Sequence, residues 1–515
     1  MNINSIIENL IKESLTSLNL EVEEVFLEHP QDLKMGDFSC NAAMMLSKKV
    51  GKNPRELADE IVSNIESNDY VEKVEVAGPG FINFYLSKKF YIDFVKEGSI
   101  NPDFLKGKKV LIEHSSPNLF KPFHIGHMVN NSIGESLVRI YQYCGADVKR
   151  LSFPSDKSLG ISKTVWGLKQ MNVENPTIEN FGEAYVLGTE KYDSEDKSIK
   201  DEINQINLDI YNEEGESFEI YKLGMNKSKA YFMMFTKKIG SEFDQFYYES
   251  ESEKVGKQVI KENTPEVFEV SDGATIFKGS EHGLYDNVFV TSAGYSTYSG
   301  KDIGLLKLKF DGFDFDKSIT VADIEQKGHF SVVKKAAEFI NKEWADKTEY
   351  IMHGRLGFSG GEKVSSRFGN VPIAEDVLEM LKAGVKKKIL EKTPDFEESQ
   401  LDEVAEKISL SAIKFSVLKV SAGKNMTFDT DKSVSTEGDS GPYLQYAYVR
   451  AHSILSKVDS VENNFDQINR EVSDFEKNLY RFSEALEKSV ESYSPHHVAH
   501  YLYTCLLYTS PSPRD

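Results

Sequence analysis

The apolar residues near the start of the chain recur at the spacing of an amphipathic helix. Five of them fall on one helical face: Ile3, Ile6, Ile7, Leu10 and Ile11. Residues 1–20 lack a basic stretch followed by a continuous apolar block, so we expect neither a signal peptide nor a membrane span. Further helices and short strands are predicted up to residues 81–86, where this first region closes.

A strand, a helix and a second strand are predicted to follow. Residues 108–112 end in the apolar run Val110, Leu111 and Ile112, as in a buried parallel strand, and apolar residues recur at helical spacing over 128–143. Residues 147–153 again have strand character. A strand–helix–strand unit of this kind indicates an open α/β sheet, which binds nucleotides where a strand passes into the next helix.

The middle of the chain interrupts this pattern. Residues from about 170 to 285 are rich in Asn, Glu, Lys and Tyr, and we interpret them as an insertion between the halves of the nucleotide-binding fold. Strand character resumes at 287–292 and 318–324. Beyond these strands the spacing becomes helical, over 373–418 and again from Tyr443 onward.

Composition limits the class of protein. A chain of 515 residues is long enough for several domains, each with its own core. Its three cysteines, Cys40, Cys144 and Cys505, are widely separated, so we expect neither a disulfide framework nor a structural metal site. The sequence contains no Gly-x-x-x-x-Gly-Lys-Ser/Thr phosphate loop and no Gly-x-Gly-x-x-Gly. The common classes of ATPase and dehydrogenase are therefore excluded.

The charge of the chain bears on its partners. A net charge of −21 at pH 7 is unusual for a nucleic-acid binder, because contacts to phosphates normally supply much of the affinity. The charge is uneven, however: much of the acidity lies in 190–219 and 249–253, whereas 382–388 is locally basic. A solvated helix face is the favoured interpretation of these lysines, and contact with a nucleic acid is the alternative.

The most informative motif lies where the first of these strands meets its helix. It spans residues 115–127 and ends in His124, Ile125, Gly126 and His127. The two histidines share one face of the first helical turn, beside N–H groups that lack intrahelical partners and favour anions. We therefore expect a phosphate chain there, and a histidine pair that only caps the helix is the alternative.

This His-x-Gly-His sequence resembles the signature of the class I aminoacyl-tRNA synthetases, which the wider nucleotidyltransferase superfamily shares. A second motif, at 361–370, is similar to their mobile Lys-Met-Ser-Lys-Ser loop, in the Ser-Ser-Arg form typical of arginyl-tRNA synthetases. Four of its residues offer charges and hydroxyls suited to a pyrophosphate leaving group: Lys363, Ser365, Ser366 and Arg367. Taken alone, this loop would be interpreted as a solvated basic turn.

The resemblance to arginyl-tRNA synthetases covers nearly the whole chain. Residues 35–43 and 76–84 are similar to the family's N-terminal tRNA-binding module, and 438–450 to the entry of its anticodon-binding domain. The implied fold is an α/β, Rossmann-like parallel-sheet catalytic domain with an α+β N-terminal domain and an all-α C-terminal domain. The implied boundaries are a tRNA-binding module at 1–100, a catalytic domain at 101–372, a helical connection at 373–437 and an anticodon-binding domain at 438–504.

The resemblance also implies the chemistry of activation. The carboxylate of an amino acid attacks the α-phosphate of ATP and expels pyrophosphate, so charge on phosphate oxygens must be stabilised. His124, Gly126 and His127, together with Lys363, match ATP-binding positions. Ser366 stands where many class I enzymes have a catalytic lysine, and Lys121, just before the first motif, is implied to compensate for it.

Recognition of arginine requires buried acceptors for a planar guanidinium, which is costly to desolvate. The family's tyrosine with an aspartate four residues later is present as Tyr298 and Asp302, which share a face if the segment is helical. By resemblance, Asp302 pairs with the guanidinium and Tyr298 lies beside it. Glu113 and Asn118 match the positions that hold the α-amino and carboxylate groups, and Gln326 matches a further substrate contact.

The implied activity is that of a cytoplasmic, monomeric arginine–tRNA ligase that uses L-arginine, ATP with Mg²⁺ and tRNA(Arg). Family resemblance further implies that tRNA is needed for efficient activation and that the 2′-hydroxyl of the terminal ribose is the acceptor. Two alternatives stay open. One is another His-x-Gly-His nucleotidyltransferase, such as the cysteine enzyme of class I, and the other is a catalytically inactive tRNA-binding paralogue.

The sequence departs from the family in several places. Residues 154–160 replace a segment that carries a Trp and a Gln in many members, and only Asp156 keeps its acidic residue. In the mobile loop, Val364 replaces a Met and Phe368 a Lys. Residues 505–515 resemble the translation of a sequencing adapter, so we expect a non-native tail after an incomplete anticodon-binding bundle.

Overall fold

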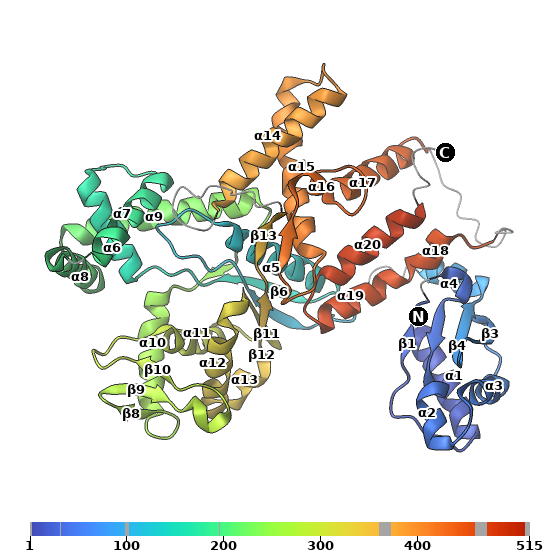
Figure 1. The fold of residues 1–515 in the computed structure, drawn as a ribbon. Helices are drawn as coiled ribbons and strands as arrows, with labels where there is room; N and C mark the ends of the chain where they lie inside the picture. Colours follow the sequence, from blue (N-terminus) through green and yellow to red (C-terminus); the bar gives the residue numbers. More distant parts are fainter. Residues whose placement is uncertain are drawn as a thin grey trace. The chain divides into compact units, whose positions relative to one another are not determined.

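The chain forms two compact units (Figure 1). The first comprises Met1–Pro102, His452–Ala485 and Tyr501–Asp515, and the second comprises Asp103–Ala451 and Leu486–His500. The structure is a computed structural model that describes residues 3–30, 32–97, 102–194, 196–359, 372–458 and 471–509.

The first unit is built on an antiparallel sheet in the order β1-β2-β4-β3. Its strands are β1 (Leu27–Glu28), β2 (Phe38–Cys40), β3 (Val71–Ala77) and β4 (Phe81–Leu86). Its helical elements include α1 (Ile3–Ser17), η1 (Leu33–Met35), α2 (Ala42–Val50), α3 (Pro54–Ser63), α4 (Lys88–Glu97) and α18 (Asp474–Leu479). The predicted first helix and closing strand are confirmed.

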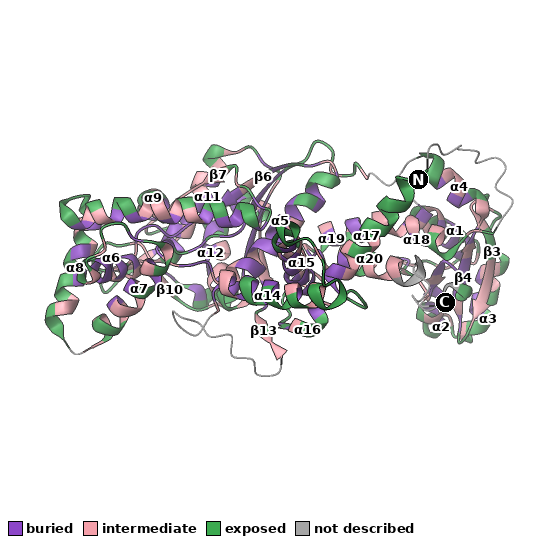
Figure 2. Cartoon of the chain, turned by 90° about the horizontal axis from the view of Figure 1, so that it is seen from above, coloured by how far each residue is buried: buried purple, intermediate pink, exposed green. Residues whose placement is uncertain are grey.

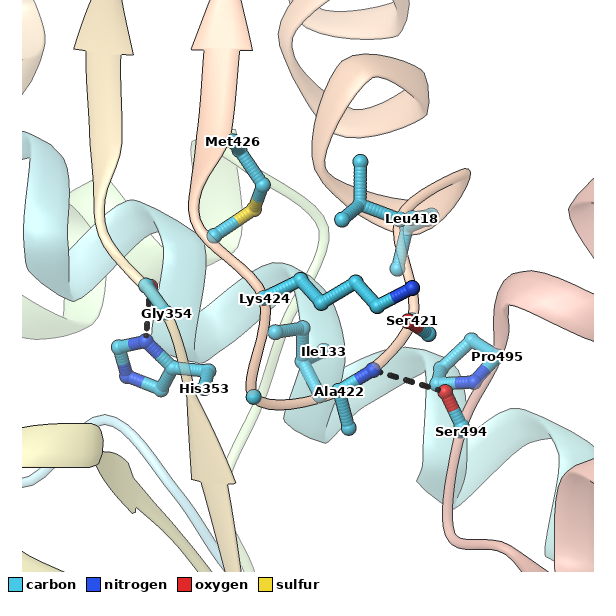
Figure 3. Close-up of a pocket in the computed structure, with 12 residues that line it drawn as sticks. Ile133, His353, Gly354, Leu418, Ser421, Ala422, Lys424, Met426, Ser494 and Pro495 are labelled. Atoms are coloured by element: carbon cyan, nitrogen blue, oxygen red, sulfur yellow. Dashed lines mark hydrogen bonds between the residues drawn. The ribbon is translucent and has the colours of Figure 1, made fainter.

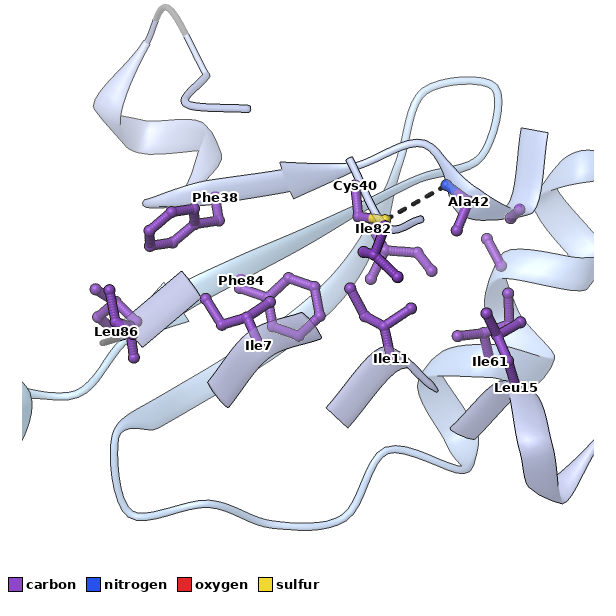
Figure 4. Packing of buried hydrophobic residues seen from close by; sticks show 14 of the residues in the cluster. Ile7, Ile11, Leu15, Phe38, Cys40, Ala42, Ile61, Ile82, Phe84 and Leu86 are labelled. Atoms are coloured by element: carbon purple, nitrogen blue, oxygen red, sulfur yellow. Dashed lines mark hydrogen bonds between the residues drawn. The ribbon is translucent and has the colours of Figure 1, made fainter. Parts of the chain in front are cut away.

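The core of the first unit lies between α1 and the sheet. Ile7 and Ile11 of α1 are fully buried and point toward Phe84 of β4 (Figure 4). The apolar stripe read from the sequence is therefore the face that packs. The ring of Tyr480 joins the same core, with its centroid 5.3 Å from that of Phe90.

The stretch around Asp37, which carries part of the family resemblance, is accounted for by packing. Gly36 has a φ of +103°, and a Cβ atom there would lie 2.8 Å from the carbonyl oxygen of Phe84, so the position requires glycine. The buried Asp37 carboxylate accepts hydrogen bonds from the N–H of Leu86 at 2.8 Å and from the hydroxyl of Tyr91 at 2.6 Å. These residues join the approach to β2 to the end of β4 and to α4.

The second unit contains a sheet in the order β12-β11-β5-β6-β7, in which all neighbouring strands of the described chain are parallel. Its strands are β5 (Lys109–Glu113), β6 (Asp147–Ser152), β7 (Gln245–Phe246), β11 (Lys317–Asp323) and β12 (Thr348–His353). Helix α5 (Ile125–Tyr143) follows β5 and packs Val129 and Leu137 into a core shared with Ile112 and Ile319 of the sheet. The predicted open α/β sheet and its strand–helix–strand unit are confirmed.

The structure contains the predicted strand at 287–292, although it lies in a different sheet, and it contains one strand of the parallel sheet that the sequence does not predict. β7 lies inside 170–285, the range that composition marks as an insertion, yet it pairs with β6 in the parallel sheet. β10 (Asn287–Val290) does not resume that sheet, but joins β9 (Ala274–Phe277) and β8 (Glu269–Ser271) in an antiparallel one. A two-residue strand is too short to leave a pattern, and alternating apolar residues do not specify the partner of a strand.

Further helices complete the middle of the second unit. The first four of them pack on one another around Val165, Phe181 and Ile203. Figure 2 shows how buried and exposed faces alternate along these helices. In chain order they are α6 (Leu159–Met171), α7 (Ile178–Asp193), α8 (Lys197–Asn212), α9 (Gly215–Lys238), α10 (Glu249–Glu262), η2 (Gly279–His282), α11 (Tyr298–Gly312), η3 (Ile324–Gln326), α12 (Lys327–Ile340) and α13 (Lys342–Lys347).

The chain beyond Pro372 is mainly helical, as the sequence predicts. The basic run at 382–388 lies on the first of these helices, where Lys382 Nζ lies 2.5 Å from the Asp402 carboxylate, with which Lys386 also pairs. These pairs favour a charged helix face over a free cationic patch. The elements after β12 are β13 (Leu356–Phe358), α14 (Ala374–Lys392), α15 (Glu398–Leu418), β14 (Met426–Phe428), α16 (Thr430–Ser433), α17 (Gly441–Leu455), α19 (Arg481–Glu491) and α20 (His496–Thr509).

A small cavity marks where the loop after α15 turns back toward β14 (Figure 3). The N–H of Ala422 donates to the hydroxyl of Ser494 at 3.2 Å, which joins this loop to the residues before α20. His353 and Gly354, at the end of β12, line the same cavity. His353 also borders a much larger cavity, so this loop supports one wall of that larger site.

Candidate active site

A cavity of about 630 Å³ lies at the carboxyl ends of β5 and β11, beside the first turns of α5, α11 and α12. Its size and its position at the ends of parallel strands are typical of ligand sites in open α/β folds. The structure brings together here eight residues that the sequence predicts as site residues, from five separate segments: Glu113, Asn118, His124, Gly126, His127, Tyr298, Asp302 and Gln326.

The two histidines of the first motif cap α5 with their own rings. The N–H of His127 donates to Nδ1 of His124 at 3.4 Å, and the N–H of His124 donates to Nδ1 of His127 at 3.2 Å. The N–H of Ile125 donates to the carbonyl of Pro372 at 2.9 Å. These three N–H groups are therefore not open to an anion, because side chains and a neighbouring segment already satisfy them.

Burial determines the charge of this histidine pair. It lowers the pKa of His124 to about 4 and lowers that of His127 well below its ordinary value, and the charge of Lys121 adds to both effects. Both rings are therefore neutral near pH 7. With each Nδ1 accepting a hydrogen bond, the proton resides on Nε2, so both rings offer an N–H donor. Capping the helix and contacting a phosphate oxygen are compatible roles for these residues.

Tyr298 and Asp302 lie one turn apart on α11, as their spacing predicts, and both line the cavity. The Tyr298 side chain is open, with 64% of the residue exposed. The Asp302 carboxylate is nearly enclosed, and its Oδ2 lies 2.5 Å from Nε2 of His329 on α12. Sequence reasoning missed His329, although its position three residues after Gln326 could have pointed to it.

A buried ion pair joins α11 to α10 at the cavity wall. Nζ of Lys301 lies 2.6 Å from the carboxylate of Glu249 on α10, and both side chains are buried. Burial opposes the charge of Lys301, but the Glu249 carboxylate outweighs it and raises the pKa of the lysine. α10 itself is held at its first turn by Asp156, which accepts hydrogen bonds from the N–H of Ser250 at 2.9 Å and from its hydroxyl at 2.5 Å. Asp156, retained where the sequence departs from the family, thus has a structural role.

Glu113, at the end of β5, already has a cationic partner. Nζ of Lys309 lies 2.5 Å from its Oε2, which also accepts a hydrogen bond from Thr320 at 3.0 Å. Lys309 is only 1% exposed and does not line the cavity, whereas Glu113 does. A ligand ammonium would therefore meet a carboxylate whose charge is partly compensated, which the sequence alone does not reveal.

Asn118 is placed by backbone pairing. It forms an isolated bridge with Ser155, flanked by hydrogen bonds from the N–H of Leu119 to Ser155 at 3.1 Å and from the N–H of Ser155 to Pro117 at 3.0 Å. These bonds tie the segment after β5 to the segment after β6. The side chain of Asn118 is thereby held at the cavity wall.

Residues 94–430 match the sequence profile described as tRNA synthetases class I (R), catalytic domain. Residues 5–86 match the arginyl tRNA synthetase N terminal domain, and residues 444–506 match the DALR anticodon binding domain. The chain belongs to the arginyl-tRNA synthetase family.

Relatives in this family resemble the chain along most of its length. The arginine–tRNA ligase of Fusobacterium nucleatum is 30% identical over 502 residues, which cover 94% of this chain and 87% of the relative. That of Halothermothrix orenii is 30% identical over 506 residues, covering 95% and 88%. The solved arginyl-tRNA synthetase of Thermus thermophilus has the same fold, with a TM-score of 0.79 at 23% identity, covering 99% of this chain and 92% of that one.

These matches confirm the predicted family, fold class and activity, an arginine–tRNA ligase. They do not support the predicted truncation, because the anticodon-domain match reaches residue 506 and the relatives are covered for 87% and 88% of their length. α20 continues to Thr509, inside the range 505–515 that was singled out as foreign. Residues 510–515 lie outside the described residues.

Lys121, the lysine that the family resemblance singles out, does not line the cavity. Its Nζ lies over the ring of Tyr185, 3.5 Å from the centroid, and Tyr185 belongs to α7. The lysine nevertheless acts on the site through its field, since it contributes to the lowered pKa values of His124 and His127. Four residues of the second motif lie outside the described residues: Lys363, Ser365, Ser366 and Arg367.

Arg355 is a cation at the cavity wall that was not predicted from the sequence. It lines the cavity with its Nε 3.5 Å from Asp323, and it also pairs with Glu325.

Within the described residues, no group of three or more His, Cys, Asp or Glu side chains is placed to hold a metal ion. No helix in the described part of this family member is long and apolar enough to cross a membrane.

Proposed function

We propose that the large cavity of the second unit is where L-arginine and ATP react to form arginyl adenylate, and where the arginyl group passes to the terminal ribose of tRNA(Arg). One observation carries the proposal. A pair of neutral imidazole donors and a tyrosine–carboxylate pair, read from distant parts of the sequence, line the same cavity. The first set suits phosphate and the second suits a guanidinium.

At the phosphate end, His124 and His127 donate from Nε2 to oxygens of ATP, and the small Gly126 lets the nucleotide approach the backbone. ATP enters as its Mg²⁺ complex, with the ion held by the phosphates. Lys363, Ser365, Ser366 and Arg367 contact the pyrophosphate as it leaves. Because the donors are neutral and fixed in a partly dry site, they stabilise new negative charge without reorganising.

At the arginine end, Asp302 accepts from the guanidinium while Tyr298 and Gln326 lie alongside it. Asn118 and Glu113 hold the carboxylate and α-amino groups nearer to the phosphates. In this pose the arginine carboxylate attacks the α-phosphate in line, the bond to pyrophosphate breaks, and a mixed anhydride with AMP forms. The 2′-hydroxyl of the tRNA ribose then attacks the carbonyl carbon of the anhydride, and AMP leaves.

Lys121 contributes its charge when the triphosphate is present. Its ammonium now lies over the Tyr185 ring, an interaction worth about 0.5–1 kcal/mol. We infer that the stronger field of the phosphates draws it toward the histidine pair, where its charge supports the transition state more than the ground state. In this proposal Lys121, which precedes the first motif, takes the role of the catalytic lysine that Ser366 replaces.

The other parts of the chain are assigned by the same proposal. Residues 1–100 form the tRNA-binding module, 101–372 the catalytic domain, 373–437 the helical connection and 438–504 the anticodon-binding domain. Within the catalytic domain, 170–285 is an insertion apart from β7, which belongs to the parallel sheet. The enzyme acts as a cytoplasmic monomer. The formal charge of −21 requires the tRNA-contacting surface to be locally less acidic than the average.

Amino-acid-dependent exchange of pyrophosphate into ATP tests this function directly. The purified chain is assayed with each of the twenty amino acids, with and without tRNA(Arg), followed by charging of tRNA with labelled arginine. Among the twenty amino acids, we expect only arginine to support exchange. This exchange should depend strongly on the presence of tRNA(Arg). Binding of tRNA without exchange would instead identify an inactive paralogue, and exchange with cysteine or another amino acid would reject the proposed pocket.

A further inference from the structure

A hydrogen bond fixes the orientation of the Asp302 carboxylate, which is proposed to bind the guanidinium. Oδ2 of Asp302 lies 2.5 Å from Nε2 of His329, the shortest contact of this histidine in the described structure. Both side chains are largely enclosed, and both residues line the cavity. A hydrogen bond to an enclosed carboxylate is strong because little water competes for it.

The histidine is itself held from its other side. Nδ1 of His329 lies 3.4 Å from the hydroxyl of Ser299, and that hydroxyl accepts a hydrogen bond from Nδ2 of Asn287 at 2.9 Å. Because Ser299 accepts from Asn287, its own proton is available to Nδ1. The proton of the ring then resides on Nε2 and is donated to Asp302. Each hydrogen bond from Asn287 through Ser299 and His329 to Asp302 therefore has one donor and one acceptor.

The ring is also fixed by packing. Its neighbour on α12, Phe330, stacks on Tyr350 of β12 with centroids 4.4 Å apart, and the rings of His329 and Phe330 meet edge to face at 5.0 Å. The first turn of α12 is thereby tied to the parallel sheet. Rotation of His329 away from Asp302 would break both the hydrogen-bond chain and this packing.

We propose that His329 is a positioning residue for arginine recognition: it holds Oδ2 of Asp302 and presents Oδ1 to the guanidinium, with Ser299 and Asn287 fixing its tautomer. The inference rests on the proposed function, since it takes Asp302 as the arginine-binding carboxylate. A single oriented oxygen favours a planar N–H donor over the tetrahedral ammonium of lysine. His329 thus acts on specificity without contacting the reacting atoms.

The test compares two substitutions of the same residue in pyrophosphate exchange. His329→Leu removes the donor, whereas His329→Gln keeps an N–H near the position of Nε2. We expect His329→Leu to raise the KM for arginine by roughly tenfold, the loss of one hydrogen bond to a charged group, with the KM for ATP within about twofold of the parent. His329→Gln should recover most of the loss, and His282→Leu, at an exposed site away from the cavity, should have no effect.

Ser299→Ala provides an independent measurement if His329→Leu does not fold. It should raise the KM for arginine about threefold, because the ring loses its second hydrogen bond but stays in place. An unchanged KM for arginine in His329→Leu, or an equal rise in both KM values that Gln does not relieve, would overturn the inference. If Asp302→Asn abolishes arginine use while His329→Leu behaves as the parent, only the role of His329 fails. If Asp302→Asn leaves arginine use intact, the proposed pocket itself is wrong.

Discussion

The two ends of the cavity offer a ligand different kinds of polar group. At the start of α5, burial keeps His124 and His127 neutral, and their rings offer dipolar N–H groups. At α11 and α12, Asp302 offers a carboxylate bonded to His329, and Lys301 forms a buried ion pair with Glu249. Neutral donors suit a phosphate chain that brings its own charge and counter-ion, whereas a guanidinium needs a charged acceptor to repay its desolvation. The nature of each end follows from what its ligand carries.

The arginine end should be the more sensitive to loss of a single charge. Asp302→Asn leaves the guanidinium without an ionic partner in an enclosed pocket, at a cost of about 3 to 5 kcal/mol. We expect arginine-dependent exchange to fall to background while ATP binding persists, measured by calorimetry. Asp311→Asn, at an exposed position on the same helix, serves as the matched control. Retained selectivity for arginine over lysine and citrulline would break the comparison.

Substitution at the phosphate end should lower kcat without weakening the binding of arginine. His127→Asn removes one fixed donor, for which we expect a drop in kcat on the order of a hundredfold. The KM for arginine should change little, because the two ends are separate. A rise in the KM for arginine as large as the fall in kcat would show that the two ends are not independent. His282→Asn controls for a histidine outside the cavity.

Lys121→Ala probes the cation that serves the phosphate end from outside the cavity wall. We expect adenylate formation to slow on the order of a hundredfold with arginine binding nearly unchanged, since the charge is needed chiefly in the transition state. Exchange kinetics with varied arginine and varied ATP separate the two parameters. Lys222→Ala, on exposed α9, is the control. A normal kcat with a raised KM would reject this role for Lys121.

The neutrality of the phosphate end predicts a pH dependence of stability. The pKa of His124 is lowered from 6.5 to about 4 in the folded chain, so between these values the unfolded state binds more protons. Folding free energy contributed by this group is complete above pH 6.5 and is lost as pH falls toward 4, at roughly 3 kcal/mol in full. Thermal melts should show this decline, and His124→Asn should flatten it. A parent and variant with the same pH profile would contradict the assignment of a buried, neutral ring.

The smallest expected effect concerns the resting place of Lys121. Tyr185→Leu removes the aromatic face over which Nζ lies, and Tyr185→Phe keeps it. A cation–π contact of about 0.5 to 1 kcal/mol corresponds to a change of roughly two- to fivefold. We expect exchange rates to change by this factor in the Leu variant and hardly at all in the Phe variant. Equal effects of both would point to the hydroxyl instead of the ring.

Several elements could be predicted because their signal is local. The apolar stripe of α1, the strand–helix junction after β5 and the spacing of Tyr298 and Asp302 all follow from the periods of the backbone itself. The motif histidines also have a fixed spacing. Resemblance to a family then supplied roles for these residues, and eight of the predicted site residues line one cavity.

Other features have no local signal. β7 is two residues long, and β10 alternates as any strand does, so neither reveals its partner. The same holds for the partners of the site residues. Thr320 and Glu113 are separated by 207 positions, Lys301 and Glu249 by 52, and Asp302 and His329 by 27. Sequence distance of this size carries no information about contact, because the path of the chain between the two residues decides it.

The amino-acid sequence by itself determined the family of this protein, its class of fold and eight of the side chains that line its large cavity. Only the tertiary structure decided the electrostatic state of those side chains. His124 is neutral because the fold buries it, Glu113 is partly compensated because Lys309 lies beneath it, and Asp302 is oriented because α12 brings His329 alongside. Desolvation and ion pairing depend on atoms that are distant in sequence and adjacent in space, so they arise only once the chain has folded.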